Sequence, residues 1–350
     1  MRRLSIGQLL MSSTNVPHLA RLKQAVRNPN LVGFAIKDRI NKAVALAQQR
    51  RFGVLTRFVL AGVSGNHVLD SYLSRSVLTN GSGEIGCHVG EHWMILDPTD
   101  EGISRTLRLF GVHERGPTTA YRSALEAAAG QVADPVVIDV GANIGYFVLH
   151  AAAATRPAGS IYAFEPDPRN LELLHTNVRT NGYEQRVTIE SKAIGATSGT
   201  RELGLSRHSN LNRILEDGRR PSRDTGEAIT VKMSSIDSYV TDHEIDPASV
   251  AGIRMDLEGF EAEVFEGMET VLAAAGPTVL FVEMHPWVLG DRHGTMLSRL
   301  AGFGFELHSA QYGVVYNRPF PMTIDAERLV DLRHVPEAYA LIAIKPASPD

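Results

Sequence analysis

From residue 135 onward the sequence alternates between short apolar segments and longer segments with helical periodicity. "PVVIDV" is followed by "GYFVLHAAAAT", "SVAGIRMDL" by "EAEVFEGMETVLAAAG", and "PTVLFVEMH" by "GTMLSRLAGFG". The segment "RVTIESKAIG" is expected to form one strand, the third, before a polar stretch. Such alternation predicts a parallel sheet with helices on both faces. Two late strand-like segments, "FELHSAQ" and "AYALIAIKP", have no long helix between them, which predicts an antiparallel pair at one edge. We therefore expect an α/β fold with a seven-stranded, mostly parallel sheet.

The stretch "VVIDVGANIGYF", residues 136–147, places a β-branched run directly before a glycine turn and a helix. In open α/β sheets, ligands bind at the carboxyl ends of strands, where the strand order reverses. Gly141 and Gly145 allow the backbone to turn tightly beside a ligand, and the helix directs free N–H groups toward it. Glu165 ends the next expected strand, where its two oxygens match the two hydroxyls of a ribose. This series predicts a nucleoside-binding site.

The turn departs from the dinucleotide fingerprint, G-x-G-x-x-G. From Gly141 the chain reads Gly-Ala-Asn-Ile-Gly, so Asn143 replaces the glycine that lets a pyrophosphate approach the backbone. This disfavours an NAD-dependent oxidoreductase of Rossmann type, which stays as the alternative enzyme. A non-catalytic, membrane-associated nucleoside-binding module is the third hypothesis.

The spacing of Asp139, Gly141, Asn143 and Gly145 resembles the first motif of the class I S-adenosylmethionine-dependent methyltransferases, whose fold is Rossmann-like. Together with "FEPDPRNLELLHTNV", "SKAIG", "IRMDLEGFEAEVFEGMETVL" and "VLFVEMH", it resembles the FkbM family over roughly residues 105–310. The resemblance implies methyl transfer from S-adenosylmethionine, usually O-methylation of a sugar, glycolipid or polyketide-type acceptor.

The resemblance also implies which residues hold the cofactor. Glu165 would hold the ribose. The methionine end and the turn would be lined by Asp139, Gly141, Asn143 and Gly145, and the adenine would be bordered by Ser191, Lys192 and Ala193. Phe260 and Leu257 depart from the residues that are more common in the family, but both changes are apolar.

An alcohol acceptor has to lose a proton, so we expect a base beside it. Asp256 ends the fourth expected strand and His285 the fifth, which brings both to the carboxyl edge of the sheet. We expect His285 or Asp256 to act as the base, with Glu258 positioning acceptor hydroxyls. The structural alternatives are a helix N-cap for Asp256 and a buried strand-end histidine for His285.

A Mg²⁺ ion could be held by a cluster of Asp256, Glu258, Glu283 and His285, and it would lower the pKa of the acceptor hydroxyl. The D-x-E spacing is too short and too common to be a metal motif. Mg²⁺ is therefore a less favoured alternative, and we assign no metal ligands.

A polar stretch over residues 201–231 separates the third strand from the next helix and is too long for an ordinary turn. We expect the part around His208 to Asn212 to cover the acceptor pocket. The alternative is a plain surface hairpin with a mobile tip.

The first 75 residues hold twelve Lys and Arg against two Asp, a net charge of +10 in a chain whose total is −4. Residues 31–50 have apolar side chains at helical spacing, so residues 1–80 should form a basic, mainly helical extension. We expect this extension to pack on the main domain or, alternatively, to contact an anionic membrane through residues 1–75. Residues 81–350 would form the methyltransferase domain, with its first strand and helix at 91–130.

The chain lacks an apolar run of the roughly 18 residues that would cross a bilayer, and its start lacks a secretory signal. With Cys87 as its single cysteine, we expect a cytoplasmic protein, or alternatively one peripheral on the inner face of the membrane. The basic region has few aromatic residues and no nucleic-acid recognition motif. The expected partner is a small-molecule or lipid-linked carbohydrate acceptor; the oligomeric state is not predicted.

Overall fold

The computed structural model describes residues 85–100, 102–155, 157–215, 221, 224–310, 322–323 and 338–347. The expected helical extension, residues 1–80, lies outside this part of the chain. No helix in the described ranges is long and apolar enough to cross a membrane.

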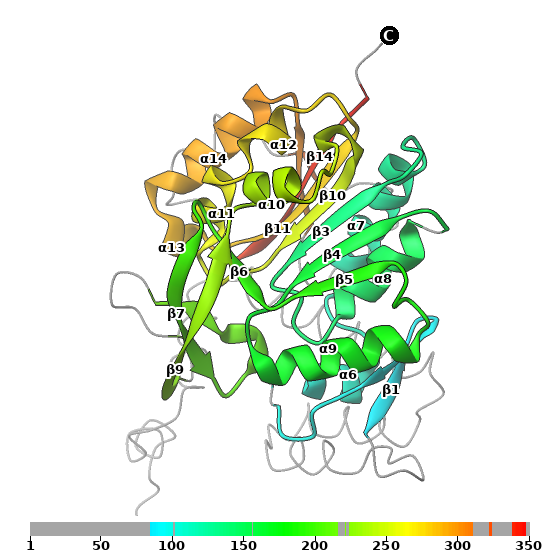
Figure 1. Cartoon of the computed structure of the whole chain (residues 1–350), viewed down its shortest axis with the longest axis vertical. Coiled ribbons are helices and arrows are strands. Elements are labelled where there is room, and N and C mark those ends of the chain that lie inside the picture. The colour runs from blue at the N-terminus through cyan, green and yellow to red at the C-terminus, as the bar shows by residue number, and fades with distance from the viewer. Residues whose placement is uncertain are drawn as a thin grey trace, which may run out of the picture.

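The central sheet has the strand order β13-β12-β14-β11-β10-β3-β4-β5 (Figure 1). Strands β3, β4, β5, β10 and β11 are parallel, whereas β14 is antiparallel to both β11 and β12. The strands span Val136–Val140 (β3), Ser160–Phe164 (β4), Val187–Glu190 (β5), Val250–Met255 (β10), Thr278–Met284 (β11), Glu306–Ala310 (β12), Met322–Thr323 (β13) and Tyr339–Lys345 (β14). The predicted sheet of seven strands with an antiparallel edge pair is confirmed, and the two-residue β13 extends it.

The strand order reverses at β3, which has β4 on one side and β10 on the other. Every residue of β3 and of β10 is buried, as expected of parallel strands that are covered on both faces. The carboxyl ends of β3, β4 and β10 therefore meet at the edge of the sheet where this fold class binds ligands.

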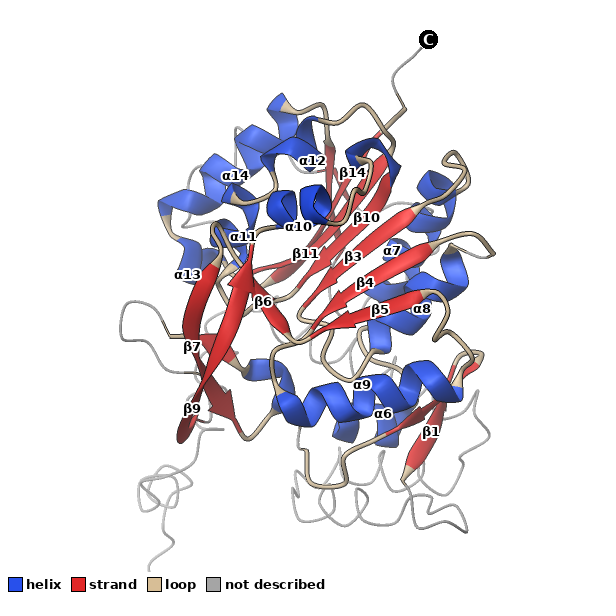
Figure 2. Ribbon diagram, in the orientation of Figure 1, coloured by secondary structure: helices blue, strands red, loops and turns tan. Residues whose placement is uncertain are grey.

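Helices cover both faces of the sheet (Figure 2). One core contains side chains of α6 (Ile103–Phe110), α7 (Arg115–Ala129), α8 (Tyr146–Ala154) and α9 (Pro168–Thr180). The other contains side chains of α10 (Ile236–Asp242), α11 (Glu261–Glu266), α12 (Glu269–Ala273) and α14 (Asp291–Gly302). The short α13 (Pro286–Leu289) follows β11, and the hairpin of β1 (Gly86–Val89) and β2 (His92–Ile95) precedes α6.

The polar stretch after the third strand forms a second sheet, in the order β6-β9-β7-β8. These strands span Lys192–Ile194 (β6), Gly199–Ser206 (β7), Arg213–Ile214 (β8) and Asp224–Ser234 (β9), with a 3₁₀ turn, η1, at Ser209–Leu211. The expectation of one strand over "RVTIESKAIG" was wrong, because β5 ends at Glu190 and β6 pairs with β9 instead of continuing in the central sheet.

The single helix expected over "EAEVFEGMETVLAAAG" is two helices, α11 and α12. Gly267 interrupts it where the chain packs against the backbone of Gly195. The Asp237 side chain then accepts hydrogen bonds from the backbone N–H groups of Thr270 and Val271, at 2.9 and 3.3 Å, which supports a new helix start.

Candidate active site

The glycine turn after β3 is built against the end of β4. The N–H groups of Gly141 and Ala142 both donate to the carbonyl oxygen of Phe164, at 2.9 Å. Gly141 has φ +77°, and a Cβ there would lie 2.7 Å from the carbonyl oxygen of Asp256. The position therefore requires glycine for both its backbone conformation and its close approach to β10.

Glu165 follows β4 and faces this turn. One carboxylate oxygen accepts from the backbone N–H of Asn143 at 2.8 Å, and the other from that of Asp167 at 2.9 Å. The Asn143 backbone reaches this position with φ +50°, in the left-handed region that asparagine tolerates better than most residues. Burial raises the pKa of Glu165 to about 7, although these hydrogen bonds act to lower it. The carboxyl group of Glu165 is thus held in one orientation, and its two oxygens can each accept a further hydrogen bond from a ligand.

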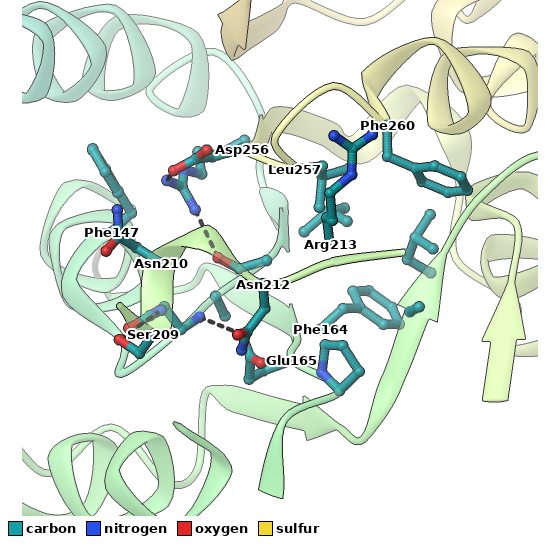
Figure 3. Close-up of a pocket in the computed structure, with 18 of the residues that line it drawn as sticks. Phe147, Phe164, Glu165, Ser209, Asn210, Asn212, Arg213, Asp256, Leu257 and Phe260 are labelled. Atoms are coloured by element: carbon teal, nitrogen blue, oxygen red, sulfur yellow. Dashed lines mark hydrogen bonds and ion pairs between the residues drawn. The ribbon is translucent and has the colours of Figure 1, made fainter. Parts of the chain in front are cut away.

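A pocket of about 830 Å³, counting its open mouth, lies over the turn and Glu165 (Figure 3). Five of the predicted cofactor residues line it: Gly141, Asn143, Glu165, Lys192 and Ala193. Three others, Asp139, Gly145 and Ser191, are not among the lining residues. Much of the remaining wall is apolar, with Phe164, Ile194, Leu203, Leu257 and Phe260.

Arg254, near the end of β10, hydrogen-bonds the glycine turn to the sheet. This residue was not predicted from the sequence. Its buried guanidinium donates to the carbonyl oxygen of Gly141 and to Asp256, both at 2.8 Å, and lies 3.5 Å from Asp139. Asp139 therefore lies beneath the turn, and burial raises its pKa to about 6 against the lowering effect of Arg254. An arginine inside the apolar strand "VAGIRM" is the signal that could have identified it.

The predicted catalytic residues lie in one group at the carboxyl ends of β10 and β11. We call this group the acidic edge: Asp256, Glu258, Glu261, Glu283 and His285. The Nδ1 atom of His285 lies 3.0 Å from Glu261, and its Nε2 atom lies 3.7 Å from Glu258 and 4.0 Å from Glu283. Glu261 is fully buried, also accepts a hydrogen bond from the backbone N–H of Gly259 at 3.1 Å, and was missed from the sequence.

The two structural alternatives at this edge have different outcomes. Helix α11 has Phe260 at its N-cap and no side-chain cap, so the N-cap alternative for Asp256 was wrong. Asp256 instead lines the pocket. His285 comes directly after β11 and is 4% exposed, as the alternative of a buried strand-end histidine expects. Neither His285 nor Glu258 is among the pocket-lining residues.

The charge states of the acidic edge follow from this packing. Burial raises the pKa of Glu258 to about 7 and raises that of Glu283 well above its ordinary value. Burial alone would lower the pKa of His285, but the hydrogen bond to Glu261 and the nearby carboxylates raise it to about 9. At neutral pH His285 is therefore a cation held among carboxylates. In the described ranges, no group of three or more His, Cys, Asp and Glu side chains could hold a metal ion.

Residues 206–214, which we call the strap, connect β7 to β8 across the pocket. Its residues Ser209, Asn210, Asn212 and Arg213 line the pocket. Asn212 donates to Asp167 at 2.8 Å, and the backbone N–H of Ser209 donates to Asp100 at 2.9 Å. The segment around His208 to Asn212 thus lies at the pocket. A segment that covers the acceptor pocket, as expected from the sequence, would have to lie there.

The sheet order, with its reversal at β3 and its antiparallel β14, is that of the class I methyltransferase fold. Residues 139–307 match the model of the methyltransferase FkbM domain. The resemblance to this family that the sequence predicts is confirmed by this match.

Individual relatives are more distant. The chain is 30% identical over 175 residues to the hexuronic acid methyltransferase AglP of Haloferax volcanii, covering 50% of this chain and 64% of that protein. It is 25% identical over 159 residues to the methyltransferase sdnD of Sordaria araneosa, covering 39% and 61%. The chain thus spans less than two thirds of the length of either relative. A crystal structure of a methyltransferase FkbM from Methylobacillus flagellatus aligns at 15% identity and a TM-score of 0.38, covering 68% of this chain and 65% of that one.

Proposed function

We propose that the protein is an S-adenosylmethionine-dependent methyltransferase that methylates a hydroxyl group of a sugar, glycolipid or polyketide-type acceptor. The observation that carries this proposal is the carboxylate of Glu165, held by two backbone N–H groups in a pocket beside the glycine turn of an FkbM domain. The turn carries Asn143 where a dinucleotide site needs glycine, which disfavours the oxidoreductase alternative.

The residues at the pocket fit this cofactor. Glu165 would accept hydrogen bonds from the ribose hydroxyls, and Gly141 and Asn143 would lie beside the methionine end. Lys192 and Ala193, with the apolar wall that includes Phe164, would border the adenine. When bound, S-adenosylmethionine supplies a methyl group on a sulfonium, which is already activated for transfer. The chain's own task is then mainly to align the acceptor and remove its proton.

The acidic edge supports proton removal by a carboxylate. His285, proposed from the sequence as a base, already carries a proton at neutral pH, so it is better suited to hold Glu258 in place. Asp256 lines the pocket, and Glu258 has a pKa near neutrality, where a general base is most effective. We therefore propose Asp256 or Glu258 as the base, with His285 as a positioning residue.

A carbohydrate acceptor is supported by the relative from Haloferax volcanii, whose name describes a hexuronic acid methyltransferase. The direct experiment is mass spectrometry of the glycolipids and polysaccharides of a strain that lacks the gene. We expect one species to lose roughly 14 mass units, the difference between a methyl group and a hydrogen atom, and to regain them on complementation. Unchanged masses would count against this acceptor class.

The cofactor can be tested separately by thermal unfolding of the full chain with S-adenosylhomocysteine or with NAD. A ligand that binds only the native state raises the melting temperature as its concentration increases. We expect stabilisation by S-adenosylhomocysteine alone, and stabilisation by NAD alone would favour the oxidoreductase.

A further inference from the structure

Arg213 is a charged residue of the pocket wall that the proposed function leaves unused. It lies on β8 at the end of the strap, and its Nε atom is buried without a hydrogen-bond partner. Figure 3 shows its side chain extending from the strap toward Leu257 and Phe260. Among the described residues, its guanidinium forms no ion pair, taken as a carboxylate oxygen within 4.0 Å of a guanidinium nitrogen.

The other cationic side chains of the pocket wall have partners. Lys192 lies 3.0 Å from Glu190, and Arg254 lies 2.8 Å from Asp256. His113, which is charged only when protonated, lies 3.3 Å from Glu114. Within the described pocket wall, Arg213 is thus the cation without a counter-ion. A partly buried guanidinium without a partner has a desolvation cost that a bound anion would offset.

The position of Arg213 indicates which ligand would bring this anion. The strap contacts the glycine turn through Ser209, whose Oγ atom lies 3.4 Å from Nδ2 of Asn143. Arg213 comes four residues later in the chain and lines the pocket together with Asp256 of the acidic edge. Its positive charge is also close enough to Glu258 to lower the pKa of that carboxyl group, against the effect of burial. Arg213 therefore lies toward the proposed base and away from the part of the strap that contacts the turn.

We infer that Arg213 binds a carboxylate of the methyl acceptor, which makes the acceptor an acidic sugar. This rests on the proposed function, because the pocket must first hold the cofactor. A guanidinium and a carboxylate form two parallel hydrogen bonds, which would orient the sugar ring as well as attract it. A neutral sugar would leave the Arg213 charge without a counter-ion in the pocket wall.

The experiment compares two sugars that differ at one carbon: methyl glucuronide, which has a carboxylate, and methyl glucoside, which has a hydroxymethyl group. Binding of each to the full chain, saturated with S-adenosylhomocysteine, is measured by calorimetry. We expect the glucuronide to bind at least about 10-fold more tightly than the glucoside. Arg213→Gln should weaken glucuronide binding by about 10- to 100-fold, which is the range for charge-assisted hydrogen bonds, and should leave glucoside binding unchanged.

Two controls check that the loss of affinity is specific to Arg213 and to the sugar. Arg207→Gln removes an exposed arginine that is also on the strap but is not in the pocket wall, and it should leave both affinities unchanged. S-adenosylhomocysteine also carries a carboxylate, and its affinity should be the same in wild type and Arg213→Gln.

Three results would overturn the inference: equal binding of the two sugars, undetectable binding of the glucuronide to the wild type, or a loss of S-adenosylhomocysteine binding in Arg213→Gln. The last would assign Arg213 to the carboxylate of the cofactor. Failure of the wild-type chain to bind S-adenosylhomocysteine would instead refute the proposed function on which the inference rests.

Discussion

Replacing Arg254 with methionine should destabilise the protein strongly, although methionine fills much of the same volume. Arg254 is buried, donates to the carbonyl oxygen of Gly141 and to Asp256, and neutralises Asp139. Its loss leaves two carboxylates without a cation and one backbone carbonyl without a donor. Breaking a buried ion pair from one side costs about 3–5 kcal/mol, which is a large part of the 5–15 kcal/mol typical of a folded domain.

The assay is urea denaturation at pH 7, comparing free energies of unfolding. A second variant tests whether the loss is electrostatic. Adding Asp139→Asn to Arg254→Met removes one stranded carboxyl group, so the double variant should be more stable than Arg254→Met alone by about 1–3 kcal/mol. An Arg254→Met variant within about 1 kcal/mol of wild type, or a double variant less stable than the single one, would refute this reasoning.

Three further predictions concern the turn, a buried histidine and the proposed base. Gly141→Ala should lower the free energy of unfolding by more than about 2 kcal/mol. Gly182 has a similar φ of +73° but open space around it, so Gly182→Ala should cost only about 1 kcal/mol. Equal costs would argue against the close approach at Gly141. Burial lowers the pKa of His150 to about 3 from 6.5, so the unfolded chain takes up a proton as pH falls below 6.5 and wild-type stability decreases. His150→Leu should remove about 2 kcal/mol of the loss between pH 7.5 and pH 5, and the same change at the exposed His175 should not. In a methyl-transfer assay, kcat should rise with pH around a midpoint near 7, and Glu258→Gln should abolish this rise; its persistence would exclude Glu258 as the base.

Much of the fold could be predicted because its signals are local. The apolar runs of β3, β10 and β11 are buried on both faces, so each is recognisable without knowledge of its neighbours. The second sheet was missed because β6 comes one residue after β5, and only its pairing with the distant β9 separates the two strands. A pairing of this kind leaves no periodicity in the segment itself.

The pocket lining could be predicted where residue type and strand end coincide, as at Glu165 and Gly141. The supporting residues could not, because their partners are distant in sequence. Arg254 contacts Gly141 across 113 residues, and Glu261 meets His285 across 24. Asp139 was assigned to the cofactor by its motif position, but the structure places it beneath the turn, against Arg254. Tertiary contacts of this kind decide whether a motif residue faces the ligand or supports the residues that do.

The central claim is that Glu165 holds the ribose of S-adenosylmethionine, and calorimetry with S-adenosylhomocysteine tests it most directly. Glu165→Gln keeps the shape of the side chain but removes its charge, and it should weaken binding by at least about 10-fold. Glu184→Gln, an exposed substitution outside the pocket wall, should bind like wild type. Thermal unfolding of each variant checks that the fold is retained. Wild-type affinity in a folded Glu165→Gln protein would contradict the claim.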